Sequence, residues 1–456
     1  MRLKKLSLLN FKNIAQEEFA LCEGINCLVG GNGAGKTNIV DAVYYLSMCK
    51  SSLQMTDGQS IRHGADFFMV EGQYRSDDEK NEVISCSYAR RSGKVLKRNG
   101  KEYERLADHV GLIPAVIVSP ADSQLISDTA EERRRYLNAC ISQLDRTYLN
   151  AVIRYNAVLT ERNRLLKTHP DEVMLSIYDM QLAEHGRLIH ERRKAFVSRM
   201  IPLVTEFYRT LSNDREQVEL VYKSELNDRP FEEILESSRP KDLVNEFTTS
   251  GIHRDDLVLK IGGYPLRKYG SQGQQKSFLI ALKLAQYAIV AEERHERPIL
   301  LLDDLFDKLD ISRVEQLIHL VKGEAFGQIF ITDCNTTRLR SILDKTEDEY
   351  TLFTIGDGRI VSAPTATNEA DTTAESCSST KETPASDGKP NPETPSECEA
   401  SCDQSQTSTE EGSQTSPNAT RESSVIEDES KVFNDTNALE NTLADESTEE
   451  VIPEPF

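Results

Sequence analysis

The strongest constraint on this chain is a glycine-rich stretch close to its amino terminus. Residues 30–37 read Gly-Gly-Asn-Gly-Ala-Gly-Lys-Thr and match the phosphate-loop pattern G-x-x-x-x-G-K-[ST]. An apolar run at 25–29 precedes the loop, and a helical pattern at 38–48 follows it. In this strand–loop–helix order, backbone N–H groups and a helix amino terminus can surround a phosphate. The sequence therefore predicts an α/β fold that binds a nucleotide.

Every residue of this loop is expected to contact the nucleotide, and two are expected to carry chemistry. The contact residues are Gly30, Gly31, Asn32, Gly33, Ala34, Gly35, Lys36 and Thr37. Lys36 should reach the outer phosphates of ATP and act in catalysis, and the hydroxyl of Thr37 should bind Mg²⁺. The alternative is a chance glycine-rich turn, which the strand–loop–helix context disfavours.

An acidic motif supplies the expected partner for the metal. The apolar run 298–302 ends in Asp303 and Asp304, and carboxylates at the end of a buried strand are unfavourable unless they bind something. We assign Asp303 to the metal and Asp304 to the general base that activates the attacking water. A pair that only caps the next helix is the alternative. The N-K-x-D motif of GTPases and the D-F-G motif of protein kinases are absent from the sequence, which excludes both classes.

A third motif lies at the start of a predicted helix, 30 residues before Asp303. Residues 271–277 read Ser-Gln-Gly-Gln-Gln-Lys-Ser, and the helical pattern continues to residue 294. The stretch resembles the signature motif of ABC-type ATPases, which implies a contact with the γ-phosphate held by the opposite subunit. The contact residues would be Ser271, Gln272, Gly273 and Gln274. The physical basis is an anion site at a helix amino terminus, here supplied in trans.

Patterns outside these motifs divide the chain into parts. Residues 67–99 alternate apolar and polar side chains, which predicts antiparallel strands, and 114–118 and 328–332 read as short buried strands. The predicted fold class is α/β: an ABC-type P-loop ATPase head with an antiparallel β subdomain, an inserted short helical arm and a disordered acidic C-terminal tail. The predicted parts are 1–125 and 251–362 for the two halves of the head, 126–250 for the arm and 363–456 for the tail.

The insertion is predicted to form two long helices. Apolar residues follow a helical spacing from residue 131 to 167, with Arg162 as the one break, and again from 172 to 203. Pro170 ends the first helix, because a proline disfavours helical geometry in the residue before it. Two such helices joined by a short turn should pack as an antiparallel hairpin. The pattern leaves open whether this is an ordinary helical subdomain or a short coiled-coil arm.

The negative charge of the chain is concentrated in its C-terminal part. The whole chain carries −21, but residues 361–456 contain 22 Asp and Glu against 4 Lys and Arg. The first 360 residues are therefore nearly neutral, and the overall acidity does not exclude a polyanionic partner. Phe433 and Phe456 are the only aromatic residues of the tail, so it cannot bury enough apolar surface to become ordered. A solvated acidic tail is preferred to a specific protein-binding segment.

Targeting signals and cysteine usage point to the cytoplasm. No run of 18 or more apolar residues occurs, and no apolar segment follows the basic start at residues 1–5. We therefore expect neither a membrane span nor a secretory signal. Nine cysteines without a C-x-x-C pair or zinc-site spacing fit a reduced, cytoplasmic compartment.

The order of the motifs resembles one family more closely than others. Ser271 lies 235 residues after Lys36, which is too far for a transporter ATPase and is similar to the SMC-like branch of ABC-type ATPases. The chain from residue 1 to about 362 resembles the RecF family of bacterial recombination-mediator ATPases. The stretches that carry this resemblance are Leu8-Leu9-Asn10-Phe11-Lys12-Asn13, the 30–37 loop with Asn38, Val118-Ser119-Pro120-Ala121-Asp122, Glu132-Arg133-Arg134-Arg135-Tyr136-Leu137, Gly251-Ile252-His253-Arg254-Asp255-Asp256-Leu257 and Ser271-Gln272-Gly273-Gln274-Gln275.

This resemblance implies a function in DNA replication, repair and the SOS response to DNA damage. It implies an ATP-dependent homodimer that binds double-stranded DNA, favouring junctions beside single-stranded gaps. Its partner would be RecR and, through RecR, RecO, in the loading of RecA. Hydrolysis would be weak, stimulated by DNA, and would act as a timer.

The sequence departs from the family pattern at four places. Gly31 replaces a common acid, Ile252 replaces a usual proline, and Asp307 stands where Ser or Ala is frequent. Asp333, after Thr332, occupies the place of a histidine that senses the γ-phosphate in related ATPases, so its role as a phosphate switch stays open.

Three basic clusters are candidates for contact with DNA, although a basic cluster is more often only a solvated face. They are Lys94-Lys97-Arg98-Lys101, Arg133-Arg134-Arg135 and Arg154-Arg162-Arg164-Lys167. The main competing function is a soluble ABC-type ATPase that acts on protein partners without a DNA role. A structural tether of the SMC type is a third reading, which the short arm disfavours.

Overall fold

The computed structural model describes residues 1–362 apart from 77–78, 169, 306–308, 310, 322–324 and 344–349. The expectations for Asp307 and for the disordered acidic tail at 363–456 lie outside the described residues. Among the helices that are described, none is long and apolar enough to cross a membrane.

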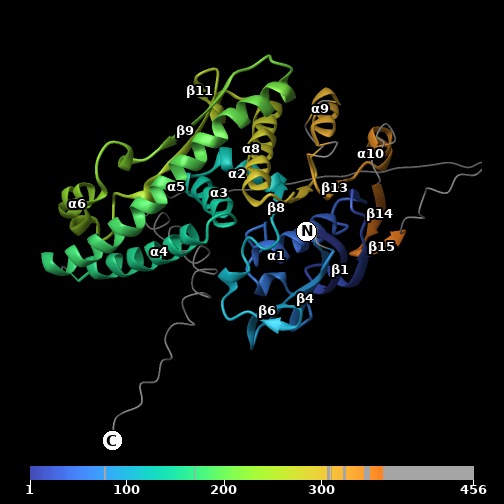
Figure 1. Cartoon of the computed structure of the whole chain (residues 1–456), viewed down its shortest axis with the longest axis horizontal. Coiled ribbons are helices and arrows are strands. Elements are labelled where there is room, and N and C mark those ends of the chain that lie inside the picture. The colour runs from blue at the N-terminus through green and yellow to red at the C-terminus, as the bar shows by residue number, and fades with distance from the viewer. Residues whose placement is uncertain are drawn as a thin grey trace, which may run out of the picture. The chain divides into compact units, whose positions relative to one another are not determined.

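The first layer is a six-stranded sheet with the order β15-β14-β3-β13-β12-β8, parallel except for the pairing of β14 with β15 (Figure 1). Its strands are β3 Ile25–Val29, β8 Ala115–Val118, β12 Ile299–Leu302, β13 Ile329–Asp333, β14 Tyr350–Gly356 and β15 Arg359–Ser362. Every residue of β3, β8, β12 and β13 is buried, which explains their continuous apolar sequences. The predicted α/β head is confirmed.

The second sheet is antiparallel and has the order β2-β1-β4-β5-β6-β7. Its strands are β1 Arg2–Phe11, β2 Ile14–Ala20, β4 Phe67–Arg75, β5 Asn81–Ala89, β6 Gly93–Arg98 and β7 Lys101–Glu102. The prediction of antiparallel strands over 67–99 is thus confirmed. Helix α1, Lys36–Met48, packs on this sheet through edge-to-face rings, because Tyr45 lies 5.5 Å from Phe68 and 5.9 Å from Phe11 between ring centroids.

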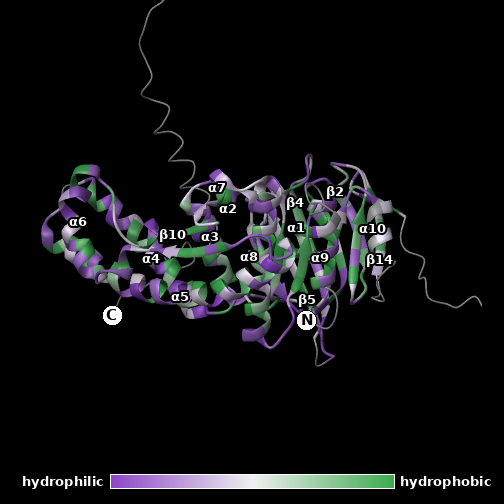
Figure 2. Cartoon of the chain, turned by 90° about the horizontal axis from the view of Figure 1, so that it is seen from above, coloured by the Kyte–Doolittle hydropathy of each residue, from purple (hydrophilic) through white to green (hydrophobic). Residues whose placement is uncertain are grey.

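The part of the insertion from residue 130 to 212 forms three helices where two were predicted. They are α3 Ala130–Ser142, α4 Arg146–Leu166 and α5 Glu172–Ser212. The single helix expected from 131 to 167 is wrong: the chain turns after Ser142, and the Asp145 side chain accepts a hydrogen bond from the Tyr148 amide at 3.0 Å to start α4. The apolar spacing continues across this short break and conceals it. α4 packs against α5 as the predicted hairpin, and Figure 2 shows hydrophobic and hydrophilic bands alternating along both.

A third, small sheet has the order β11-β10-β9 and belongs with the helices. Its strands are β9 Val218–Lys223, β10 Asp256–Ile261 and β11 Tyr264–Pro265. β9 packs on α5 and β10 on α3, so this sheet pairs strands from both sides of the predicted boundary at residue 251. The division of the chain into domains stays a prediction.

The remaining elements connect these layers. The long helix α8, Gln272–Arg294, packs along α5 and against β8, and α6, Phe231–Asn245, also packs on α5 (Figure 1). The other helices are η1 Gly58–Ser60, η2 Leu106–Asp108, η3 Pro120–Ser123, α2 Gln124–Ser127, η4 Glu225–Asn227, η5 Ile252–Arg254, α7 Leu266–Tyr269, α9 Ile311–Val321 and α10 Thr336–Leu343.

Candidate nucleotide-binding site

The phosphate loop connects β3 to α1, and its glycines are required by geometry. Gly35 adopts φ 109° immediately before α1, a conformation that L side chains rarely adopt. A Cβ at Gly30 would lie 2.2 Å from the carbonyl oxygen of Ile355 in β14, so only glycine fits there. The loop thus closes tightly at both ends, as a backbone cradle for phosphate requires.

Lys36 is folded onto the loop that it belongs to. Its Nζ donates hydrogen bonds to the carbonyl oxygens of Gly30, at 2.7 Å, and Gly31, at 2.8 Å, and the residue is buried. The positive charge is therefore held at the concave side of the loop by two neutral acceptors. A phosphate oxygen is a stronger acceptor for an ammonium group than a carbonyl, so this lysine is placed to bind an anion.

The acidic motif meets the loop through two hydroxyl groups. Thr37 Oγ1 donates to Asp303 Oδ1 at 3.0 Å, although the two residues are 266 positions apart. Thr332 Oγ1 donates to the same oxygen at 2.8 Å. The structure therefore brings the two predicted metal ligands, Thr37 and Asp303, into direct contact; their roles as ligands stay predictions.

The second oxygen of this carboxylate suits a magnesium ion. Asp303 is 1% exposed, and its Oδ2 is buried without a hydrogen-bond partner among the described residues. Burial raises the pKa of Asp303 above its ordinary value of 3.8, while the two threonine hydroxyls and Lys36 oppose the shift. A hydroxyl and a carboxylate oxygen are the hard ligands that Mg²⁺ prefers, so these residues fit the metal.

Asp304 is held in a special backbone conformation beside this carboxylate. Its φ of 48° lies in the left-handed region, and its amide donates to Thr332 Oγ1 at 2.8 Å. Its carbonyl oxygen accepts a hydrogen bond from Lys276 Nζ at 3.2 Å. These contacts hold the backbone of Asp304 next to Asp303, and its role as the general base stays a prediction. Neither Thr332 nor Lys276 is among the residues that the sequence predicts for this site. The signal for Thr332 was its place near the end of a buried strand, because the ends of neighbouring parallel strands such as β12 and β13 meet at the same edge of a sheet.

Asp333 follows at the end of β13 and is 1% exposed. Its Oδ1 accepts the Asn335 amide at 2.9 Å, which closes a turn after the strand. A role as a phosphate switch therefore stays a prediction.

Asn13, in the turn between β1 and β2, is a further residue at the loop. Its Nδ2 donates to the Gly33 carbonyl at 3.4 Å, and its Oδ1 accepts from Asn38 Nδ2 at 2.8 Å. The Gly358 amide donates to the Ala34 carbonyl at 2.8 Å. Two turns distant in sequence therefore support the phosphate loop, and periodicity alone gave no signal for either.

The signature motif forms the exposed start of α8. Ser271 is the N-cap: its Oγ accepts the Gln274 amide at 3.3 Å, and its own amide donates to Gln274 Oε1 at 2.7 Å. Gln274 Nε2 donates to Glu216 Oε1 at 2.9 Å, and Tyr208 donates to the other oxygen of Glu216. The side-chain hydrogen bonds of this cap thus go to Glu216 and not to the phosphate loop of the same chain. Ser271 and Gln272 are exposed, Gly273 is partly exposed, and a partner can reach the helix end.

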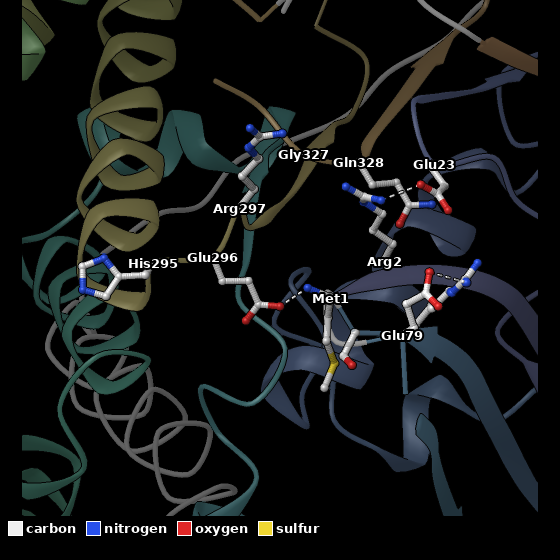
Figure 3. A pocket seen from close by; sticks show the side chains of 11 residues that line it. Met1, Arg2, Glu23, Glu79, His295, Glu296, Arg297, Gly327 and Gln328 are labelled. Carbon is white, nitrogen blue, oxygen red and sulfur yellow. Dashed lines mark hydrogen bonds and ion pairs between the residues drawn. The ribbon is translucent and has the colours of Figure 1, made fainter. Parts of the chain in front are cut away.

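A different cavity lies at the opposite edge of the parallel sheet (Figure 3). It encloses about 570 Å³ and is lined in part by Arg297 and Gln328, which precede β12 and β13. Its charged side chains largely neutralise each other, because Arg2 pairs with Glu23 at 2.5 Å and Glu296 pairs with the amino group of Met1. The predicted nucleotide residues are absent from its lining, so cavity size does not identify the site.

Replacing Asp303 should separate stability from metal binding. Asp303→Asn keeps an acceptor for both threonines and removes a negative charge whose burial is unfavourable. Because the pKa of Asp303 is higher in the folded chain than its ordinary value of 3.8, the wild type loses stability as the pH rises from 3.8 through the pKa of the folded state. This loss of stability persists at neutral pH. We expect the nucleotide-free variant to melt roughly 2–4 °C above wild type at pH 7.5, with a smaller difference at pH 4.

The same variant should lose the contribution of Mg²⁺ to ATP binding, measured by calorimetry with and without the metal. Glu184→Gln, at an exposed position of α5, is the matched control and should change neither property. A melting temperature below that of wild type at pH 7.5 would contradict the assignment of a destabilising buried charge.

Comparison with known proteins agrees with this geometry. Residues 2–348 match the family described as RecF/RecN/SMC N terminal domain. The chain is 47% identical over 362 residues to the DNA replication and repair protein RecF of Bacteroides thetaiotaomicron, which covers 79% of this chain and 98% of that protein.

Solved structures give the same result. A structure of the recombination mediator protein RecF with ATP, from the RecFOR pathway, is 32% identical and superposes with a TM-score of 0.71 over 78% of this chain and 96% of the other. An Smc head bound to the C-winged helix domain of ScpA is 16% identical, with a TM-score of 0.50 over 79% of this chain and 98% of the other. The second similarity concerns the fold alone.

Proposed function

The chain belongs to the RecF family of DNA replication and repair proteins, and on that premise we propose that it is an ATP-gated DNA-binding protein. The observation that carries the proposal is the hydrogen bond from Thr37 to Asp303, which joins the phosphate loop to the acidic strand end. The exposed cap at Ser271 supplies a second anion site for a partner subunit.

Within one subunit, the residues described above would bind ATP with Mg²⁺. Lys36 would exchange its two carbonyl acceptors for oxygens of the outer phosphates, and Thr37 and Asp303 would hold the metal through oxygen atoms. The metal would supply charge neutralisation at the β- and γ-phosphates. Asp304 would accept a proton from the attacking water, since its backbone is held directly after the predicted metal ligand Asp303.

Between subunits, ATP would act as the link in a homodimer. The start of α8 has free N–H groups and a partial positive charge, and it would meet the γ-phosphate bound to the second chain. A two-fold axis would then create two equivalent composite sites. Because the γ-phosphate completes both contacts, weak, DNA-stimulated hydrolysis would time the opening of the dimer.

The closed dimer is proposed to bind double-stranded DNA at the edge of single-stranded gaps. The family membership and the solved RecF of the RecFOR pathway support this role. RecR is the proposed direct partner, and RecO and RecA are engaged through it. A soluble ATPase that acts on proteins alone is the competing function. Filter binding of a gapped duplex separates the two: we expect retention that requires ATP, whereas no retention with or without ATP would contradict the proposal.

Lys36→Ala should weaken ATP binding by about 10- to 100-fold, because hydrogen bonds that involve a charged group contribute roughly 1.5–3 kcal/mol. Isothermal titration with ATP and Mg²⁺ measures the change. Lys5→Ala is the matched control, since Lys5 forms a partly exposed pair with Glu18 on β2 and should bind ATP like wild type. Equal affinity of Lys36→Ala and wild type would show that the loop is not the nucleotide site.

A further inference from the structure

The tertiary structure uses many of the predicted DNA-contacting cations internally. Arg133 pairs with Asp256 at 2.7 Å, and Arg134 donates to the Asp255 carbonyl at 2.9 Å. Arg162 is fully buried. A cation that is already neutralised by a carboxylate, or removed from solvent, contributes little to the attraction of a polyanion. These parts of two of the basic clusters are therefore poor candidates for the DNA surface.

The cluster on the β5–β6–β7 hairpins is also partly used. Lys94 pairs with Asp57 at 2.7 Å and is 5% exposed, and Arg98 forms two hydrogen bonds with Glu82. Lys97 and Lys101 remain exposed toward the far end of these strands. Of the four cations in this cluster, Lys97 and Lys101 are therefore available to DNA, whereas Lys94 and Arg98 are already paired with carboxylates.

A different group of cations is left free at the other end of the same sheet. Arg90 and Arg91 form the turn between β5 and β6, and Arg62 lies in the loop that leads into β4. The Arg90 amide donates to the Asp66 carbonyl at 3.4 Å, so the turn and the loop lie side by side. All three arginines are exposed, and within the described residues none of them has a carboxylate partner.

The charge balance of this arginine surface, defined as Arg62, Arg90 and Arg91, is positive. Asp66 is the one exposed acid of the loop, and Asp57 is already paired with Lys94. Guanidinium groups bind phosphate oxygens with two parallel hydrogen bonds and remain charged at every physiological pH. Three of them on two adjacent turns, without a counterion from the described chain, suit the backbone of a nucleic acid.

The arginine surface is connected to the nucleotide site by the β1–β2 turn. On one side of this turn, the Arg62 amide donates to the Asn10 carbonyl and the Lys12 amide donates to the Ser60 carbonyl, both at 2.8 Å. On the other side, Asn13 contacts the Gly33 carbonyl of the phosphate loop.

Lys12 fixes the turn to the helix that follows the phosphate loop. Its Nζ pairs with Asp41 of α1 at 2.6 Å, with the two side chains 5% and 0% exposed. The connection therefore consists of backbone hydrogen bonds to the loop of Arg62, a buried ion pair to α1 and an exposed side-chain contact of Asn13 with the phosphate loop.

We propose that Arg62, Arg90 and Arg91 bind the phosphate backbone of double-stranded DNA beside the nucleotide site. The proposal deepens the proposed function and rests on it, because it names the surface of the ATP-bound dimer that meets DNA. Contacts from loops to phosphates do not read the base sequence, and a protein that recognises a junction by its shape needs no such readout.

The test compares two triple variants of the full chain. The first is Arg62→Gln with Arg90→Gln and Arg91→Gln. The matched control is Lys97→Gln with Lys101→Gln and Arg105→Gln, which removes three exposed cations from β6, from β7 and from the segment after β7. Binding to a gapped duplex is measured by fluorescence anisotropy with a slowly hydrolysed ATP analogue, over a series of salt concentrations. ATP affinity and sedimentation are measured in parallel.

The first variant should bind DNA at least about tenfold more weakly, and the slope of log K against log salt should fall by roughly 2–3 for three lost phosphate contacts. ATP affinity, dimerisation and hydrolysis without DNA should stay at wild-type values, and the control should keep most of the affinity and slope. Wild-type DNA affinity and slope in the first variant, or an equal loss in the control, would overturn the proposal. A wild-type chain that binds no DNA with ATP would contradict the proposed function itself.

Discussion

Ser271→Arg should keep the chain monomeric at every ATP concentration while each monomer still binds ATP. The side chain of Ser271 is exposed and caps α8 with two hydrogen bonds to Gln274. A bulky guanidinium at this position removes the cap and occupies the space that the γ-phosphate of the second subunit would take. The side chains of Lys36 and Thr37 donate their hydrogen bonds to Gly30, Gly31 and Asp303, so ATP binding within one chain should not depend on Ser271.

Asp304→Asn should have the opposite effect and accumulate ATP-bound dimers. The phosphate contacts remain, but the attacking water loses its base, so hydrolysis no longer opens the dimer. Asparagine also tolerates the left-handed conformation that Asp304 adopts at φ 48°, and the backbone should be preserved. The two variants therefore separate closure of the dimer from hydrolysis.

Sedimentation velocity with and without ATP measures both effects, and DNA affinity should follow the dimer content. Tyr264→Arg introduces the same guanidinium charge at a β11 position that is 59% exposed, and it should dimerise like wild type. If Ser271→Arg forms dimers with ATP and binds a gapped duplex normally, the composite site in trans is wrong for this protein.

Arg162→Ala should lower the free energy of unfolding by about 3–5 kcal/mol, because it leaves the buried carboxylate of Asp242 without its counter-charge, whereas Asp179 keeps its pair with Arg239. Arg162 is 0% exposed and donates to Asp179 and to Asp242, each at 2.8 Å. Its Nη1 also donates to Thr248 at 2.8 Å. One side chain of α4 thereby holds α5 and α6 together.

Chemical denaturation followed by circular dichroism measures this loss. Arg187→Ala is the matched control on α5, since its pair with Glu232 spans 3.4 Å between side chains that are 58% and 50% exposed. Such exposed pairs contribute about 0–1 kcal/mol. Equal stability of Arg162→Ala and wild type would show that the buried charges are satisfied in another way.

Arg162 also shows where sequence periodicity fails. A charged residue in an apolar stripe looks like a break, because the pattern contains no information on partners from other helices. Asp179 and Asp242 lie 17 and 80 positions away, and only the packing of three helices brings them to the guanidinium. The break after Ser142 was hidden for the related reason that a short turn preserved the spacing.

The sequence by itself determined the features that are local in the chain. The phosphate loop, the apolar strand before Asp303 and the capped start of α8 each depend on a few adjacent residues, whose backbone preferences act at short range. The family and the α/β head followed from the order of these motifs.

Only the tertiary structure decided which distant side chains meet. The sheet order β3-β13-β12 brings the hydroxyl groups of Thr37 and Thr332 to the same carboxylate oxygen of Asp303. Folding likewise neutralises or buries many of the cations that the sequence offered to DNA, and it leaves exposed the arginine surface that the β1–β2 turn connects to the phosphate loop. Contacts of this kind depend on strand register and helix packing across hundreds of residues, which residue spacing does not encode.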